Sequence, residues 1–95
     1  MYSAVSRVKT EKASRYLKAL CNHFDRKVQA TYDDNHGDVQ FGFGTCQMDA
    51  AGDVLTLNIQ ADDAEQLERV KQVVGGHLVR FAPNESLEVD WVEQA

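Results

Sequence analysis

The first quarter of the chain shows two successive patterns of hydrophobic residues. Residues 2–8 alternate weakly between apolar and polar positions, which predicts a first strand. Behind Thr10, which we expect to cap the next element, apolar residues recur every three or four positions as far as Phe24. This spacing predicts an amphipathic helix with one face on a core. Its apolar stripe comprises Ala13, Tyr16, Leu17, Leu20, Cys21 and Phe24.

The middle of the chain alternates apolar and polar residues as strands do. Residues 33–37 predict a hairpin turn, and residues 51–53 predict another turn. The apolar side changes parity across Gly42 and Gly44, which predicts a bulge or a sharp bend there. The apolar positions of these predicted strands are Val28, Ala30 and Tyr32; Val39, Phe41 and Phe43; Cys46, Met48 and Ala50; and Leu55, Leu57 and Ile59.

A second amphipathic helix is expected after the last of these strands. Asp62 and Glu65 have the spacing of a capping box, and Pro83 with Asn84 is expected to end the helix. Alternation then returns over residues 87–91 and predicts a final strand. The apolar stripe of the helix contains Leu67, Val70, Val74, Leu78 and Phe81, and that of the strand contains Leu87, Val89 and Trp91.

This order of elements predicts an α+β fold. We expect a two-layer sandwich in which a mainly antiparallel sheet carries two helices on one face, in the order β-α-β-β-β-β-α-β. A chain of 95 residues is the size of one domain, so residues 1–95 are expected to form a single α+β domain. The other face of the sheet should be polar, or else buried in an oligomer.

Composition excludes several classes of protein. With 43 % hydrophobic and 26 % charged residues, the chain is neither disordered nor collagen-like. No apolar run is long enough to cross a bilayer, and the first fifteen residues lack the apolar stretch of a secretory signal. Two cysteines without a CxxC pair fit a reducing compartment. We therefore expect a cytoplasmic protein that binds no membrane.

Charge is distributed unevenly along the chain. The net charge is −5, but residues 1–27 carry seven basic and two acidic residues, giving +5 there and −10 elsewhere. The split predicts a basic surface for an anionic partner, or a homo-oligomer in which a basic face meets an acidic one. A solvated helix surface is the simplest explanation. The net negative charge of the whole chain argues against binding to duplex DNA, and we expect no nucleic-acid partner.

Three histidines and two cysteines are candidate metal ligands. His23 and His77 lie at the borders of the two helical stripes, so helices packed side by side would bring their imidazoles together. His36 lies in the acidic turn, and Cys21 and Cys46 would add sulfur ligands. Such a set suits a divalent metal such as zinc or iron. No HxxxH or CxxC motif supports the site, and a histidine at such a border is commonly a packing residue.

Other motifs give no evidence of catalysis. Residues 42–44 form a lone GxG without the third glycine and the helix of a dinucleotide fingerprint. The acidic turn lacks the ligands of an EF-hand loop, and Gly75-Gly76 is expected to mark close helix packing. Cys21 and His23 point about 200° apart on a helix and cannot form a nucleophile–base pair. The sequence therefore does not predict an enzyme.

Three stretches together resemble a known family. They are residues 15–24 (RYLKALCNHF), His36-Gly37 leading to residues 43–46 (FGTC), and residues 77–81 (HLVRF). With them, nearly the whole chain resembles the bacterial domain of unknown function 2218. The resemblance implies a small α+β protein without an established activity. Some members are joined to, or encoded near, siderophore-interacting, flavin-linked iron reductases, which implies a siderophore or iron-reductase pathway.

The resemblance also singles out individual residues. The family's characteristic positions include the candidate ligands above together with Gly37, Gly44 and Phe81, which favours the hypothesis of a site. In that hypothesis His23, His36 and His77 bind a metal, and Cys21, Cys46 and Gly44 contact the ligand. A histidine that often follows the Cys-x-His element in the family is absent here, where residues 25–27 read Asp-Arg-Lys. This departure puts metal binding by the present chain in doubt.

Two functions remain open at this point. The first is a binding module for a metal ion or an iron chelate, built on the histidines and cysteines. The second is a homodimeric protein-interaction module without a ligand site, suggested by the uneven charge and by the sheet face that the helices leave free.

Overall fold

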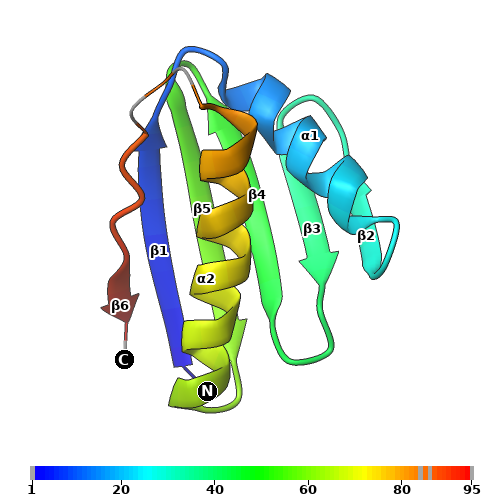
Figure 1. The fold of residues 1–95 in the computed structure, drawn as a ribbon, viewed down its shortest axis with the longest axis vertical. Helices are drawn as coiled ribbons and strands as arrows, with labels where there is room; N and C mark the ends of the chain where they lie inside the picture. Colours follow the sequence, from blue (N-terminus) through cyan, green and yellow to red (C-terminus); the bar gives the residue numbers. More distant parts are fainter. Residues whose placement is uncertain (1, 84, 86, 95) are drawn as a thin grey trace.

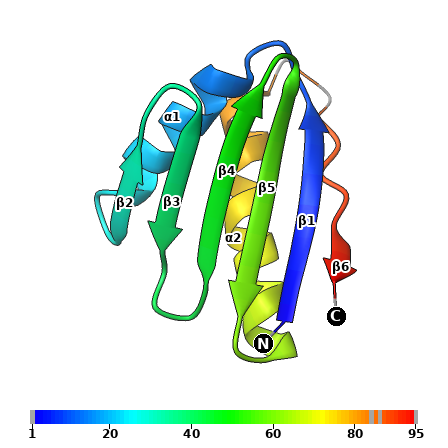
Figure 2. The ribbon, with the colours of Figure 1, turned by 180° about the vertical axis from the view of Figure 1, so that it is seen from behind.

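Six strands and two helices form one sheet with a helical layer. The computed structural model describes residues 2–83, 85 and 87–94. Both helices lie against one face of the sheet, and Figure 2 shows the uncovered face from behind. The predicted two-layer α+β sandwich is therefore confirmed. In chain order the elements are β1 (Tyr2–Lys9), α1 (Ala13–Phe24), β2 (Gln29–Tyr32), β3 (His36–Gln40), β4 (Thr45–Ala51), β5 (Val54–Ala61), α2 (Ala64–Phe81) and β6 (Val92–Gln94).

The sheet has the order β2-β3-β4-β5-β1-β6, and every neighbouring pair is antiparallel. Hairpins connect β2 through β5 in sequence, and β1 then pairs with β5 along its whole length. Helix α1 lies over β2, β3 and β4, whereas α2 lies mainly over β5 and β1 (Figure 1). The two helices consequently lie next to each other on the same face.

The core fills the space between the helices and the sheet. Alternate residues of each central strand point into it, and their neighbours point to the uncovered face, which is mainly polar, one of the two alternatives that the sequence left open. No helix among the described residues is long and apolar enough to cross a membrane. The largest fully buried side chains are Leu17, Leu20, Met48, Leu55, Leu57, Ile59, Leu67, Leu78, Val8, Val39, Val70 and Val74.

Helix α1 begins two residues later than a cap at Thr10 would require. Its first residue is Ala13, and Lys12 before it provides no side-chain cap. The Thr10 hydroxyl instead accepts a hydrogen bond from the Lys12 N–H at 3.1 Å. The prediction of Thr10 as the helix cap is thus wrong, because this hydroxyl holds the turn that leads into the helix.

Helix α2 is capped by Asp63 and not by the predicted Asp62. Asp63 has the extended backbone that a cap needs, and its carboxylate accepts a hydrogen bond from the Gln66 N–H at 2.8 Å. The helix runs to Phe81, whereas Asn84, expected to end it, lies outside the described residues. The Asp62 side chain makes no hydrogen bond within the described part of the chain.

The predicted strand through Phe41 and Phe43 ends earlier than expected. Strand β3 stops at Gln40, and residues 41–44 form a hairpin loop closed by the Phe41 N–H donating to the Gly44 carbonyl at 2.8 Å. Gly42 has a φ of 90°, a backbone conformation that favours glycine. The change of parity therefore reflects a reversal of the chain between two strands.

The C-terminal strand also differs from the prediction. Residues 87–91 are irregular, and the strand is β6, which pairs with β1. Val89 and Trp91 pack partly buried against the core beside α2, because Gly75 leaves room for them. A β-carbon at Gly75 would lie 3.5 Å from Val89 Cγ1 and 3.7 Å from Trp91 Nε1. This glycine thus faces the C-terminal segment and not the other helix.

Replacing Gly44 by alanine is expected to destabilise the fold. The new β-carbon would lie 2.5 Å from Val70 Cγ2 and 2.7 Å from the Gln60 carbonyl oxygen. Relieving such overpacking typically costs about 1–3 kcal/mol. Urea denaturation followed by circular dichroism measures the loss in the free energy of unfolding.

Gly76→Ala is the matched control. Its β-carbon meets nothing within 4 Å on an exposed helical position, so alanine should stabilise the helix by about 0.5–1 kcal/mol. Equal stability of Gly44→Ala and the wild type would show that the loop moves away from α2 at no cost.

Candidate functional site

A cleft opens where the end of α1, the middle of α2 and the β3–β4 loop meet. Its volume is about 370 Å³. We call it the interhelical cleft. Its lining is mainly apolar and aromatic, with a few nitrogen-bearing side chains among them, which is the usual character of a small-molecule site. The lining residues are His23, Phe24, Lys27 and Val28; Phe41 and Phe43; and Arg69, Val73 and His77.

Three phenylalanines form a continuous aromatic wall. The Phe24 and Phe41 rings meet edge to face with their centroids 5.0 Å apart. Phe41 and Phe43 are stacked, with centroids 5.4 Å apart and an interplanar angle of 23°. Flat aromatic walls favour a flat partner, because ring faces pack best against other planar groups.

Two histidines meet in the cleft, one from each helix. The ring centroids of His23 and His77 are 4.9 Å apart, as their positions at the stripe borders predicted. His77 Nδ1 lies 2.6 Å from the Val73 carbonyl oxygen, which can only accept, so this nitrogen carries a proton. Burial lowers the pKa of His23, and the neighbouring His77, Arg26 and Lys27 lower it further. His23 is therefore neutral at pH 7.

Lys27 and Arg69 give the cleft its charge. The Arg69 guanidinium carbon lies 4.3 Å from the centroid of the Phe43 ring, a cation–π contact. No carboxylate lines the cleft, and neither cation forms an ion pair with a residue that the structure describes. The cleft thus combines aromatic walls with two positive charges that no described carboxylate neutralises.

His36 lies far from the other two histidines, on the uncovered face of the sheet. Its Nδ1 is 2.8 Å from Asp49 Oδ1, and its Nε2 is 3.0 Å from Asp38 Oδ2. These two hydrogen bonds raise its pKa. The three histidines consequently do not converge, and the described residues contain no group of three histidine, cysteine or acidic side chains that could hold a metal.

Both cysteines are buried in the core, Cys21 on α1 and Cys46 on β4, and neither lines the interhelical cleft. Cys21 Sγ lies 3.9 Å from Met48 Sδ. Burial raises the pKa of Cys21 to about 11, and it raises that of Cys46 as well. Both thiols are protonated at pH 7 and so lack the thiolate form that metals and electrophiles require.

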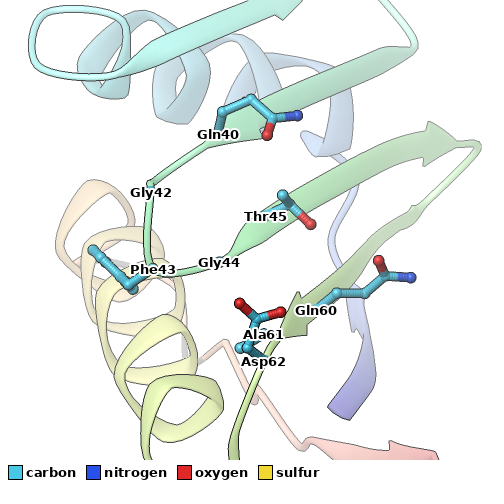
Figure 3. A pocket seen from close by; sticks show the side chains of 8 residues that line it. All are labelled: Gln40, Gly42, Phe43, Gly44, Thr45, Gln60, Ala61 and Asp62. Atoms are coloured by element: carbon cyan, nitrogen blue, oxygen red, sulfur yellow. The ribbon is translucent and has the colours of Figure 1, made fainter. Parts of the chain in front are cut away.

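Two further positions from the sequence analysis lie near the site. Gly44 lines a second hollow on the other side of the β3–β4 loop, where it faces Thr45 and the end of β5 (Figure 3). Phe81 meets the His23 ring edge to face with centroids 5.6 Å apart. Gly37 lies under α1, where a β-carbon would come within 2.6 Å of Cys21 Sγ.

Comparison with known proteins places the chain in a family. Residues 5–92 match the family described as uncharacterized proteins conserved in bacteria, domain of unknown function 2218. The chain belongs to this family. It is similar to the protein PA4090 from Pseudomonas aeruginosa, whose structure was solved by NMR, with a TM-score of 0.82 and 34 % sequence identity over 97 % of this chain and 96 % of that one. No curated protein matches the chain.

The sequence analysis missed Lys27 and Arg69. Arg69 is a charged residue of α2 and Lys27 lies in the turn after α1, and charged residues at such positions usually face solvent. A signal was nevertheless present, because Lys27 follows His23 by four residues, and Arg69, Val73 and His77 succeed one another at intervals of four. Residues four apart lie on the same side of a helix, so Arg69 shares the side of His77, and Lys27 follows His23 at the same interval just past the end of α1.

His23 and His36 are expected to titrate on opposite sides of the ordinary histidine pKa of about 6.5. The two carboxylates that bind His36 favour its charged form, whereas burial disfavours the charged form of His23. NMR titration of the imidazole signals measures both. Asp49→Asn should lower the pKa of His36 and leave that of His23 unchanged.

The same shifts predict the pH dependence of stability. For His36 the folded-state pKa is raised, so its contribution is complete below about pH 6.5 and is lost as pH rises through the folded-state pKa. His23 acts in the opposite direction, because its lowered pKa makes protonation below about pH 6.5 unfavourable to the folded state. A His36 signal that titrates below that of His23 would contradict both assignments.

Proposed function

We propose that the protein is a binding module for a small, planar, anionic organic molecule held in the interhelical cleft. One observation carries the proposal: Lys27 and Arg69 stand unpaired, within the described residues, in a cleft with an aromatic wall and no acidic lining residue. An anion would supply the missing charge, and a planar body would pack on the phenylalanines.

The size and chemistry of the cleft suit such a ligand. A volume of about 370 Å³ falls near the lower end of the usual range for small-molecule sites, so a molecule with one or two rings fits. Arg69 presents a planar guanidinium that can bind a carboxylate through two parallel hydrogen bonds. Lys27 adds a second positive charge on the side of α1, and its ammonium group does not require the anion to bind in one orientation.

The histidine pair adds hydrogen-bonding groups with which the cleft can bind hydroxyl groups of the ligand. Neutral His23 can exchange hydrogen bonds with a phenolic or catecholic hydroxyl, since an uncharged imidazole has one donor and one acceptor nitrogen. His77 binds the Val73 carbonyl through Nδ1, which leaves its Nε2 for a hydrogen bond with the ligand. An iron chelate, as the family resemblance implies, belongs to this class when its ligand is a planar phenolate or catecholate. A bare metal ion has less support, because the described residues offer no group of three ligands.

Titration with 2,3-dihydroxybenzoate tests the proposal. We expect shifts of the Phe43, Arg69 and His77 amide signals in NMR spectra, with weaker binding of uncharged catechol and of non-planar cyclohexanecarboxylate. Arg69→Gln should weaken binding about tenfold or more, since a hydrogen bond to a charged group is worth about 1.5–3 kcal/mol. Arg80→Gln, which removes an exposed charge of α2 outside the cleft, is the control.

Each alternative has its own outcome. Equal binding by the wild type and Arg69→Gln, or equal binding of the three probes, would exclude the proposed recognition. Repeating the titration with the iron(III) complex of the same probe tests the chelate. Stabilisation of the fold by zinc alone, lost in His23→Ala and His77→Ala, would favour a bare metal instead.

A homo-oligomer is a second proposal, based on charge. Helix α1 and the residues that flank it expose Lys12, Arg15 and Arg26, whereas the first turns of α2 expose Glu65 and Glu68. Opposite charges on two exposed surfaces favour contact between copies, and salt screens such contact. Light scattering should then show a dimer that dissociates as salt rises. A monomer at every ionic strength would remove this proposal.

A further inference from the structure

A second hollow of about 180 Å³ lies on the uncovered side of the sheet, where β3 ends, β4 begins and β5 ends. We call it the strand-end pocket. The β3–β4 loop separates it from the interhelical cleft: the backbone of the loop faces this pocket, and the Phe43 ring lies with Arg69 on the side of the cleft. Its lining residues are Gln40, Gly42, Phe43, Gly44, Thr45, Gln60, Ala61 and Asp62 (Figure 3).

Strand register places three polar side chains in one row across the pocket. Gln40 pairs with Thr45, and Thr45 pairs with Gln60, so the three residues are direct neighbours on three adjacent strands. Their chain neighbours Val39, Cys46 and Ile59 are buried, which leaves this row on the uncovered face. The row thus presents two carboxamides and one hydroxyl side by side.

Asp62 completes the pocket and provides its charge. Because Asp63 caps α2, the Asp62 carboxylate has no structural task at the helix start. Within the described part of the chain it makes neither a hydrogen bond nor an ion pair. Figure 3 shows this carboxylate beside the end of β5, with the Gln40 side chain across the pocket.

The row offers the pocket three acceptor oxygens besides its donor groups, and the Asp62 carboxylate, which can only accept, turns the balance toward a ligand that donates hydrogen bonds. No side-chain hydrogen bond of Gln40, Thr45 or Gln60 to another described residue is present, so their oxygens are available to accept. No lysine, arginine or histidine lines the pocket, and its one ionised side chain is negative. Its charge is therefore opposite to that of the interhelical cleft.

The glycines of the loop keep the pocket open and fix its wall. Gly42 adds no side chain and has a φ of 90° that other residues rarely adopt. Gly44 is packed so tightly that a β-carbon would clash with Val70 and with the Gln60 carbonyl. The wall is consequently held in place before any ligand arrives, which lowers the entropic cost of binding.

We propose that the strand-end pocket binds a compact organic cation rich in N–H donors, a primary ammonium or a guanidinium group. The Asp62 carboxylate neutralises its charge. The Gln40, Thr45 and Gln60 oxygens accept its remaining N–H groups. One carboxylate is too few for a site selective for a divalent metal, whereas it matches a single positive charge.

Titration with methylguanidinium and with n-propylammonium chloride tests the proposal. We expect saturable shifts of the Gly42, Gly44 and Thr45 amides and of the Gln40 and Gln60 side-chain NH₂ signals. Tetramethylammonium has the same charge but no N–H group and should bind at least fivefold more weakly. Sodium chloride at equal ionic strength gives the shifts that salt alone produces.

Asp62→Asn should reduce the affinity about tenfold and leave the fold intact, because Asp63 still caps the helix. Glu65→Gln is the matched control, since it removes a charge from the first turn of α2 outside the pocket. Unchanged affinity in Asp62→Asn, or equal shifts with tetramethylammonium, would overturn the proposal. So would stronger binding of glucose, a neutral polyol, at the same amides.

This site is independent of the interhelical cleft. Arg69→Gln should leave methylguanidinium binding unchanged, and Asp62→Asn should leave 2,3-dihydroxybenzoate binding unchanged. Failure of one proposal therefore does not affect the other. Loss of both ligands in either variant would show that the two hollows form one site.

Discussion

The position of the β3–β4 loop depends on its contact with helix α2 through Gly44. The backbone at this residue comes so close to Val70 and to the Gln60 carbonyl that no side chain fits. The hydrogen bond from the Phe41 N–H to the Gly44 carbonyl closes the loop on this anchor. One side of the loop then presents Phe41 and Phe43 to the helices, and the other presents bare backbone to the sheet face. The two hollows are thus defined by a single contact.

The sequence predicted the elements well where one face of the sheet is covered and the other is free. Under that condition burial forces strict alternation, as in Leu55, Leu57 and Ile59 of β5. The same alternation was misleading at Phe41 and Phe43. Their rings stack on one side of a loop, and residues two apart in a strand also lie on one side, so the two arrangements give the same pattern. Three-dimensional placement of the next strand was needed to separate these two cases.

The helix caps show a related limit. Asp62 and Asp63 are chemically equivalent candidates, and the backbone at the end of β5 decides between them. A local pattern predicts that a helix begins in this segment, but it does not predict which residue is the cap.

The parts of the candidate site that follow from local sequence patterns could be predicted, and the parts that depend on how distant segments pack could not. The meeting of His23 and His77 follows from two stripe borders and two helices on one face. Strand β3 begins at His36, so alternation from the buried Val39 places this histidine on the opposite face; the sequence had put residues 33–37 in a turn, where parity does not apply. The role of Lys27 and Arg69 depends on the shape of the cleft around them, which no residue spacing records.

The two ends of the chain lie together at one edge of the sheet. Ser3 pairs with Gln94, and β1 and β6 run side by side, whereas the loop that bounds both hollows connects β3 and β4 (Figure 1). A short linker could therefore join the termini in a circular permutant, with new ends placed in another exposed turn. A second domain fused at the N-terminus would start close to the strand-end pocket, because Tyr2 pairs with Ala61 of its lining.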